Sequence, residues 1–190
     1  MRDLEPPGAL TDNTSYPFEF KKSEKQFETY NGIMVRIRYY INVTINRQYA
    51  KITKEEEFIV QNIDDEPVQN PPIRMEVGIE DCLHIEFEFQ NSKFHLKDCI
   101  HGKVNFNLVR IKIRQMELSL IRREIIGQGA NQITENETLC KFEIMDGAPV
   151  KGEVIPVRFY LASAELTPSY KNINNRVSCK YILNLVLLDE

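Results

Sequence analysis

The sequence lacks a long apolar run, and no stretch approaches the ~20 consecutive apolar residues that a membrane-spanning helix requires. Its first seven residues, Met1 to Pro7, also lack the apolar core of a secretory signal peptide. Signals for helices are scarce, because no long segment places apolar residues at a period of 3.6. These absences predict a soluble, cytosolic chain whose fold contains few helices.

The sequence also lacks an excess of basic residues and has no closely spaced cysteines. The 24 Lys and Arg residues are outnumbered by 28 Asp and Glu residues, which gives a net charge of -4 and no general attraction to nucleic acid or anionic lipid. At 190 residues and 42% hydrophobic content, the chain can bury a core without cross-links. We therefore expect no nucleic-acid partner, and reduced thiols at the four cysteines, none of which forms a Cys-x-x-Cys pair: Cys82, Cys99, Cys140 and Cys179.

Motifs for catalysis are absent. No serine lies in a Gly-x-Ser-x-Gly turn, and no glycine-rich segment precedes a helix as a phosphate-binding loop does. One group of residues has the side chains that zinc prefers, but its spacing does not match a structural zinc motif. A zinc enzyme is therefore only an alternative hypothesis, to be tested by the metal content of the purified protein, and its ligands would be Cys82, His84, His95, Cys99 and His101.

Two-residue alternation is what the sequence has in abundance. Residues 35–46 carry an aliphatic or aromatic side chain at every odd position, and the rhythm returns in residues 83–89 and 155–161. Because successive side chains of a strand point to opposite faces, the odd residues of each run are predicted to face one core. Turn pairs separate the apolar runs, as in antiparallel hairpins: Asn31-Gly32, Asn91-Ser92, His101-Gly102, Asp146-Gly147 and Lys151-Gly152. The pattern predicts an all-β sandwich.

Composition also divides the chain. Residues 64–72 are polar and contain three prolines, which disfavour a regular strand ladder, so we place a domain boundary there. Residues 127–138 contain two glycines among mixed polar residues and predict a long mobile hairpin loop. Residues 51–57 have weak helical character but suit a strand equally well.

The apolar positions change parity in the second half. Val109, Ile111 and Ile113 are odd, whereas Met116 and Leu118 are even. A one-residue insertion in a strand produces this change, so we predict a β-bulge or sharp bend near residues 114–115 that turns one long strand across two surfaces of the sandwich.

A basic stripe accompanies this strand. Arg110, Lys112 and Arg114 share one face, with Arg122 and Arg123 just beyond. A nucleic-acid surface is one reading. Cross-strand pairing with nearby acids is the favoured one, and the candidate acids are Glu86, Glu88, Glu117 and Glu124.

Two apolar residues stand next to each other just before a turn, Ile144 and Met145. In a regular strand one of them must face outward, which indicates a partner surface. The alternative is that Met145 covers the end of the core.

Four tracts closely resemble the arrestin-like subunit of the endosomal retromer complex: residues 75–89, 93–97, 109–118 and 143–153. The resemblance extends from Leu4 to Glu190 and implies two arrestin-like β-sandwich lobes side by side. Family members begin before this Met1 and continue past Glu190, so the first lobe is expected to be incomplete. The implied division is a partial amino-terminal lobe at 1–66, a linker at 67–72 and a carboxy-terminal lobe at 73–190.

The resemblance also implies a non-enzymatic adaptor without a cofactor. Such an adaptor joins a helical solenoid subunit to sorting nexins and to the cytosolic tails of membrane cargo, for retrieval from endosomes to the Golgi or the plasma membrane. It would be cytoplasmic and peripheral on the endosome membrane, with membrane association indirect, through its partners. A β-sandwich carrier of a small apolar ligand remains the alternative, which native mass spectrometry of the purified protein would test.

Three sets of site residues follow from the resemblance. Docking on the solenoid subunit is expected at Ile144, Met145, Asp146 and Gly147. A groove for a sorting nexin and an extended cargo peptide is expected along Met75, Glu76, Val77, Gly78, Ile79, Glu80 and Asp81. Gly78 in such an edge strand would let another backbone approach closely. Ile63 matches a position that contacts a PDZ-bearing nexin in some family members.

Overall fold

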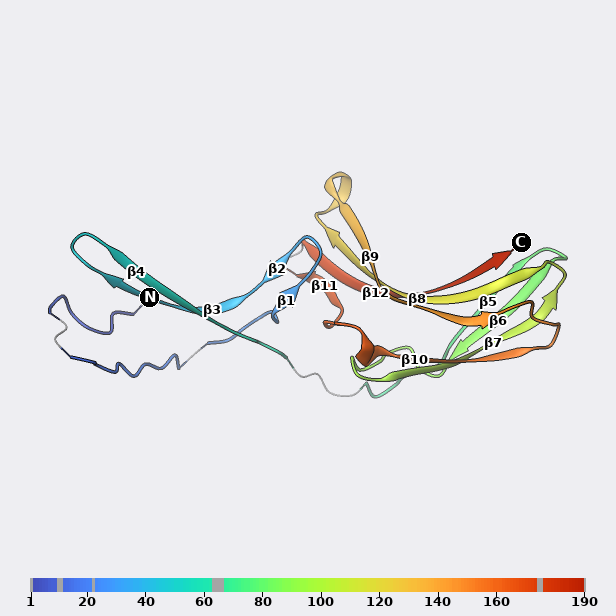
Figure 1. Ribbon diagram of the computed structural model, residues 1–190, viewed down its shortest axis with the longest axis horizontal. Coiled ribbons are helices and arrows are strands. Elements are labelled where there is room, and N and C mark those ends of the chain that lie inside the picture. Colours follow the sequence, from blue (N-terminus) through green and yellow to red (C-terminus); the bar gives the residue numbers. More distant parts are fainter. Residues whose placement is uncertain (1, 10–11, 22, 63–66, 174–175, 190) are drawn as a thin grey trace.

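Two four-stranded antiparallel sheets form a β-sandwich in the computed structural model, which describes residues 2–9, 12–21, 23–62, 67–173 and 176–189 (Figure 1). The first sheet has the order β10 (Val154–Tyr160), β7 (Cys99–Val109), β6 (Leu83–Phe89), β5 (Ile73–Ile79). The second has the order β11 (Tyr170–Ile173), β12 (Val177–Asp189), β8 (Ile113–Ile126), β9 (Ile133–Asp146). The predicted all-β antiparallel fold is confirmed.

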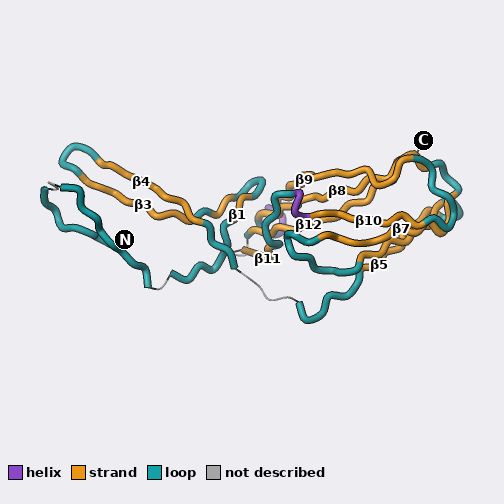
Figure 2. The backbone as a smooth tube through the Cα atoms, turned by 60° about the horizontal axis from the view of Figure 1, so that its bottom comes forward, coloured by secondary structure: helices purple, strands orange, loops and turns teal. Residues whose placement is uncertain are grey.

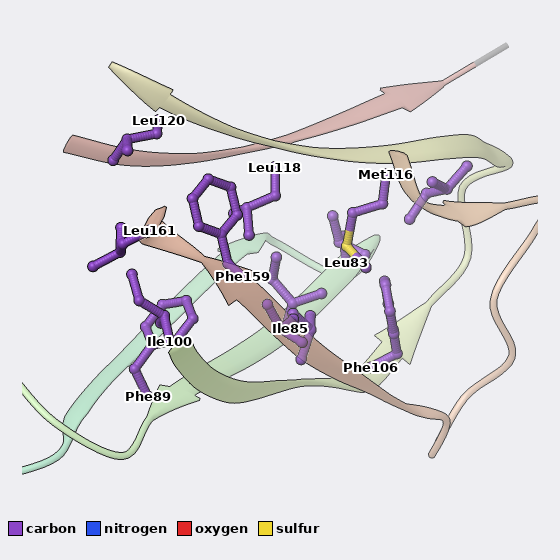
Figure 3. Packing of buried hydrophobic residues seen from close by; sticks show 13 residues of the cluster. Leu83, Ile85, Phe89, Ile100, Phe106, Met116, Leu118, Leu120, Phe159 and Leu161 are labelled. Atoms are coloured by element: carbon purple, nitrogen blue, oxygen red, sulfur yellow. The ribbon is translucent and has the colours of Figure 1, made fainter. Parts of the chain in front are cut away.

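The core lies between these two sheets, and the predicted alternation supplies it. Leu83 and Ile85 point inward from β6, and Val157 and Phe159 from β10, each at most 6% exposed. Figure 3 shows side chains from both sheets meeting in one layer. The cluster of buried residues comprises Leu83, Ile85, Phe89, Ile100, Val104, Phe106, Ile113, Met116, Leu118, Leu120, Val157, Phe159 and Leu161.

The predicted bulge is confirmed at Arg114. In the pairing of β8 with β12, Asp189 lies opposite Ile113 and Leu188 opposite Gln115, which leaves Arg114 without an opposite residue. The prediction of one continuous strand is wrong, because β7 ends at Val109 and residues 110–112 carry the chain from the first sheet to the second. The bulge then resets the parity of the buried residues on β8.

Two turn predictions are corrected. His101 and Gly102 lie inside β7, where Gly102 pairs with Val157 of β10. The loop predicted at 127–138 is shorter, because β8 reaches Ile126 and β9 begins at Ile133, with a 3-10 turn at Gly129–Asn131 between them. Residues 134–138 are polar on both faces because β9 is an exposed edge strand, so the sequence carried no alternation signal there.

The amino-terminal part forms two small sheets. β1 (Tyr30–Asn31) pairs with β2 (Arg36–Ile37), and β3 (Tyr39–Asn46) pairs with β4 (Lys51–Phe58). Residues 51–57 are therefore in a strand. Figures 1 and 2 show the β3–β4 hairpin extending away from the sandwich.

The alternation in residues 35–46 predicted one strand packed on a core. The strand is interrupted at Arg38, and along β3 the odd side chains of Val43 and Ile45 are 43% and 42% exposed. The expectation of a covered face is wrong for these residues, because no second sheet of the described residues stacks on the hairpin. In the part of the chain that the structure describes, no helix has the length and apolar character to cross a membrane.

Candidate functional site

Strand β5 is an open edge of the first sheet. Among the described residues it pairs with β6 alone, so its outer backbone N–H and C=O groups have no partner strand in this part of the chain. Met75, Val77 and Ile79 lie opposite Phe87, Ile85 and Leu83 in register, on the same face as the core. Their side chains nevertheless remain 50%, 49% and 58% exposed. The apolar inner face of the sandwich therefore continues onto β5, the predicted groove strand. The free edge of this strand can accept another strand.

A cavity of about 220 Å³ lies at the end of this strand. It joins β5 to the sheet crossover and to the end of β12, and its lining is Val77, Gly78, Ile79, Leu83, Ile85, Ile111, Ile113, Leu187 and Asp189. Pockets that enclose a small ligand usually measure ~300 Å³ or more, so this cavity gives the ligand-carrier hypothesis little support. Its apolar lining suits a side chain of a bound segment.

The structure brings together only part of the predicted groove at this cavity. Glu80 and Asp81 lie in the turn after β5, where Asp81 has a φ of +57°. Sequence reasoning missed Ile111, Ile113 and Leu187. The parity change had marked the bend that contains Ile111 and Ile113, but a bend in one strand does not specify which distant strand it meets.

Gly78 allows close packing within the β5–β6 hairpin. A Cβ added at Gly78 would lie 2.7 Å from the carbonyl oxygen of Leu83 on β6, a contact that real Cβ atoms do not make. The glycine therefore lets β6 approach β5 closely. The Leu83 carbonyl thus explains the glycine without a partner, and close approach of a partner backbone to exposed Gly78 stays a prediction.

The outer face of β5, β6 and β7 carries ion pairs. Glu88 of β6 is 3.1 Å from Arg74 and 3.4 Å from Lys103, and His84 is 3.6 Å from Glu76. The hydrogen bond that Arg74 donates holds the pKa of the Glu88 carboxyl below its usual range, with a further contribution from Lys103. The Arg74–Glu88 pair ties β5 to β6 at neutral pH, and the Lys103–Glu88 pair ties β7 to β6.

Replacing Glu88 by glutamine is expected to remove part of the acid dependence of stability. Because the pKa of Glu88 is lower in the folded chain than in the unfolded chain, its contribution is present above the unfolded pKa of ~4.3 and is lost as the pH falls through the folded pKa. Urea unfolding at pH 6 and pH 3 should therefore show the parent chain and Glu88→Gln converging in acid. Glu86→Gln is the control on the same strand, and an equal difference at both pH values would contradict the assignment.

The second predicted surface, at the end of β9, is built differently from expectation. Met145 pairs with Met116 and Glu143 with Glu117, so Ile144 is the extra residue of a β-bulge. The bulge breaks the alternation, and Ile144 and Met145 are both half-buried against the core. The prediction that one of them faces fully outward is wrong, and the alternative that Met145 covers the end of the core is confirmed.

The turn itself is exposed and well anchored. Asp146 and Gly147 are exposed, and Gly147 has a φ of +103°, which favours glycine. The Gly147 N–H donates to the carbonyl oxygen of Arg114 over 2.8 Å. Sequence reasoning did not single out Val150 in the following connection or Val154 at the start of β10, which are 67% and 52% exposed. An isolated valine in a loop, such as Val150, carries no periodic signal.

A buried carboxylate joins the amino-terminal part to the second sheet. Glu124 of β8 is fully buried and accepts hydrogen bonds from the Tyr30 hydroxyl at 2.6 Å and from the Met34 N–H at 2.5 Å. Gly32 makes this approach possible, because a Cβ there would overlap the Glu124 carboxylate. The expectation that Glu124 pairs with the basic stripe is wrong, since its partners come from β1 and the turn after it.

A second acid reinforces this contact. Glu28 accepts from the Tyr170 hydroxyl at 3.1 Å and from the Asn62 N–H at 2.9 Å. The rings of Tyr30 and Tyr170 meet edge to face with centroids 5.4 Å apart. Burial is the main cause that raises the pKa of both tyrosine hydroxyls, so they remain hydrogen-bond donors.

Two residues at the end of the basic stripe make cross-strand contacts. Arg122 forms an ion pair with Glu137 of β9, and Arg123 donates to the Asn136 side chain at 2.8 Å. The Arg110 guanidinium donates to the carbonyl oxygen of Asp81 at 3.3 Å. Arg122 makes a cross-strand pair, but its partner Glu137 is not one of the expected acids. Glu117 pairs with Lys141, and Glu88 with Arg74 and Lys103, instead of with the stripe.

The zinc-type residues do not converge. Cys82 lies in the turn before β6, His84 on β6, His95 in a loop, and Cys99 and His101 on β7. Within the described ranges, no three His, Cys, Asp or Glu side chains are placed to hold a metal ion. All four cysteines are free thiols, and burial raises the pKa of Cys140 and Cys179. The predicted nexin contact at residue 63 lies outside the described residues.

Comparison with known proteins adds a family match over residues 1–190, to the model described as vacuolar protein sorting-associated protein 26. The chain is 55% identical to the protein of that name from Dictyostelium discoideum over 191 residues, covering all of this chain and 55% of that protein. It is 56% identical to vacuolar protein sorting-associated protein 26B of Arabidopsis thaliana, covering 63% of it, and 51% identical to the 26B protein of Homo sapiens, covering 56%. The chain thus spans somewhat more than half the length of these relatives.

Proposed function

Because the chain belongs to the vacuolar protein sorting-associated protein 26 family, we propose that it acts in protein sorting as a non-enzymatic adaptor of a retromer-type coat. In this role it links a helical solenoid subunit to sorting nexins and to the cytosolic tails of membrane cargo. It works on the cytoplasmic face of endosomes and reaches the membrane through these partners.

The observation that carries the proposal is the open edge of β5 beside the apolar cavity. A cargo tail in extended conformation adds to the edge through main-chain hydrogen bonds, and one apolar side chain of the tail enters the cavity. The lining of the cavity by Val77, Ile79 and Leu187 supports this mode. A sorting nexin packs over Met75 and its neighbours, which are half exposed.

The second surface supports docking on the solenoid subunit. Its exposed apolar residues are Val150 and Val154, which follow half-buried Ile144 and Met145 in the chain. A few apolar residues that become fully covered supply most of the binding energy at such an interface. Asp146 and Gly147 fix the direction of the turn.

A crossed pair of variants tests the proposal. Val77→Glu places a charge in the cavity and is expected to weaken binding of a nexin–cargo-tail pair by at least about tenfold, while solenoid binding stays unchanged. Val150→Asp is expected to do the reverse, because Val150 is 67% exposed and belongs to the other surface. Isothermal titration calorimetry with each purified partner measures both effects.

Each variant is the control for the other. Ile144→Asp is expected to cost ~2 kcal/mol or more in solenoid binding, but Ile144 also contacts the core, so Val150→Asp is the cleaner test. Solenoid binding that survives both substitutions in folded chains would refute the second surface. Cargo binding by Val77→Glu at parental affinity would refute the first.

A further inference from the structure

A side chain of the linker is bonded to the sandwich just before β5 begins. The side-chain oxygen of Asn70 accepts hydrogen bonds from the Ser92 N–H at 2.9 Å, the Ser92 hydroxyl at 3.3 Å and the Lys93 N–H at 2.8 Å. Its side-chain nitrogen donates to the carbonyl oxygen of Lys93 at 2.8 Å. We propose that these four hydrogen bonds, which we call the Asn70 clamp, keep the binding edge β5 formed when the amino-terminal part moves relative to the sandwich.

The Asn70 clamp continues the β5–β6 pairing beyond its last backbone pair. Ile73 lies opposite Phe89, and Asn70 precedes Ile73 by as many residues as Ser92 follows Phe89. Residues 71–72 between them are both prolines, and proline has no N–H to donate to a strand ladder. The Asn70 side chain therefore makes the connection that the backbone cannot make at this end of the hairpin.

The turn that receives these hydrogen bonds is itself fixed to the sandwich. The Gln90 N–H donates to the carbonyl oxygen of His101 on β7 at 3.1 Å. In the loop between these two residues, Phe94 is half-buried against the core. A displacement of the linker therefore meets a fixed support at Asn70, before it reaches β5.

The chain on the other side of the linker is held by the other sheet. The Asn62 N–H donates to Glu28, and Glu28 also accepts from the Tyr170 hydroxyl of β11. In Figures 1 and 2 the chain before β5 reaches the sandwich at the end that faces the amino-terminal part. Opening of the contact with the second sheet therefore pulls on the chain that leads into the first sheet, and this pull arrives at the start of β5.

β5 is the strand that such a pull would detach. Among the described residues it pairs with β6 alone, so local opening can start at Ile73 and proceed pair by pair along the strand. With the Asn70 clamp in place, the displacement ends at Asn70 and the outer edge of β5 stays formed. An added strand needs a formed edge, because it bonds to consecutive backbone groups. The inference rests on the proposed function for what the edge binds, whereas the clamp itself is a property of this chain alone.

Hydrogen exchange of the backbone amides of residues 73–79, read by mass spectrometry, tests the Asn70 clamp. Glu124→Leu opens the contact with the second sheet by removing the acceptor of Tyr30, and it is expected to leave exchange in β5 unchanged. Asn70→Ala alone is expected to raise this exchange about twofold and the double variant at least about tenfold, because only the double variant lets the opening reach β5. If Glu124→Leu does not fold, Tyr30→Phe removes one hydrogen bond of the same contact and takes its place.

The non-additive rise separates a clamp from a residue that only stabilises its own loop, because independent effects would give the double variant no more than the exchange of Asn70→Ala. Gln69→Ala is the matched control: it removes the neighbouring amide side chain, which is exposed, and combined with Glu124→Leu it is expected to leave β5 unchanged. Faster exchange in β5 of Glu124→Leu alone would overturn the proposal. A double variant that exchanges no faster than Asn70→Ala would do so as well.

Calorimetric titration with a nexin–cargo-tail pair separates this inference from the proposed function. The double variant is expected to bind at least about tenfold more weakly than Glu124→Leu, because part of its β5 edge is open. Equal affinity of these two variants, with faster exchange in β5 of the double variant, would overturn the role of the Asn70 clamp in binding. A parent chain that does not bind the pair refutes the proposed function, and the exchange measurement then decides the Asn70 clamp on its own.

Discussion

Replacement of Phe106 by alanine is expected to lower the free energy of unfolding by about 3–5 kcal/mol. Phe106 lies on β7, is fully buried, and belongs to the layer between the two sheets (Figure 3). The truncation removes apolar contact and leaves a cavity that strands fixed by hydrogen bonds on both sides cannot fill. Its own N–H donates to the carbonyl oxygen of Glu153 at 2.9 Å, which holds the backbone in place.

Urea unfolding followed by far-ultraviolet circular dichroism measures this loss. Phe20→Ala is the control, because Phe20 is 59% exposed and its removal should change the free energy by less than about 1 kcal/mol. Similar losses for the two variants would mean that the layer containing Phe106 is not the core that holds the sandwich together.

Replacement of Glu124 by leucine is expected to cost about 3 kcal/mol and to loosen the β1–β2 hairpin first. The substitution leaves the buried Tyr30 hydroxyl and the Met34 N–H without their acceptor, and a buried unsatisfied donor costs roughly 1–3 kcal/mol. The burial of Tyr30 would no longer be compensated, so the contact between β1 and the second sheet should open locally before the sandwich unfolds.

Hydrogen exchange of the backbone amides, read by mass spectrometry, detects this opening. Exchange in residues 28–37 is expected to become faster in Glu124→Leu, whereas residues 83–89 should keep their protection. Glu135→Leu is the control, because Glu135 lies opposite Glu124 on β9 and is exposed. Unchanged exchange at Met34 would show that the carboxylate does not hold the hairpin.

The alternation of apolar residues determined the fold class because it is a local property of the strand. Ile85 and Phe159 face the core for the same reason that their neighbours face water, and no knowledge of distant strands is needed to see it. The bulge at Arg114 was also readable, since an inserted residue shifts the parity of every position after it. The resemblance to a family predicted a groove along residues 75–81, and the edge position expected for this strand is confirmed.

The burial of the Glu124 carboxylate could not be predicted from the alternation of apolar residues. Glu124 stands on the inner face of β8 with Leu118 and Leu120, but beyond the sandwich core, where Tyr30 meets it. In the sequence it is one acid among basic neighbours. Which donor reaches it depends on how a hairpin 90 residues earlier docks on the sheet.

The sequence by itself therefore determined the strands, most of the turns and the face of each strand that is apolar, because these follow from backbone geometry over a few residues. Only the tertiary structure decided what covers each face: a second sheet for β6, a hairpin for the end of β8, and no other strand of the described chain for β3. The physical reason is that burial depends on contacts between residues far apart in the chain, and alternation records that a face is apolar without recording its partner.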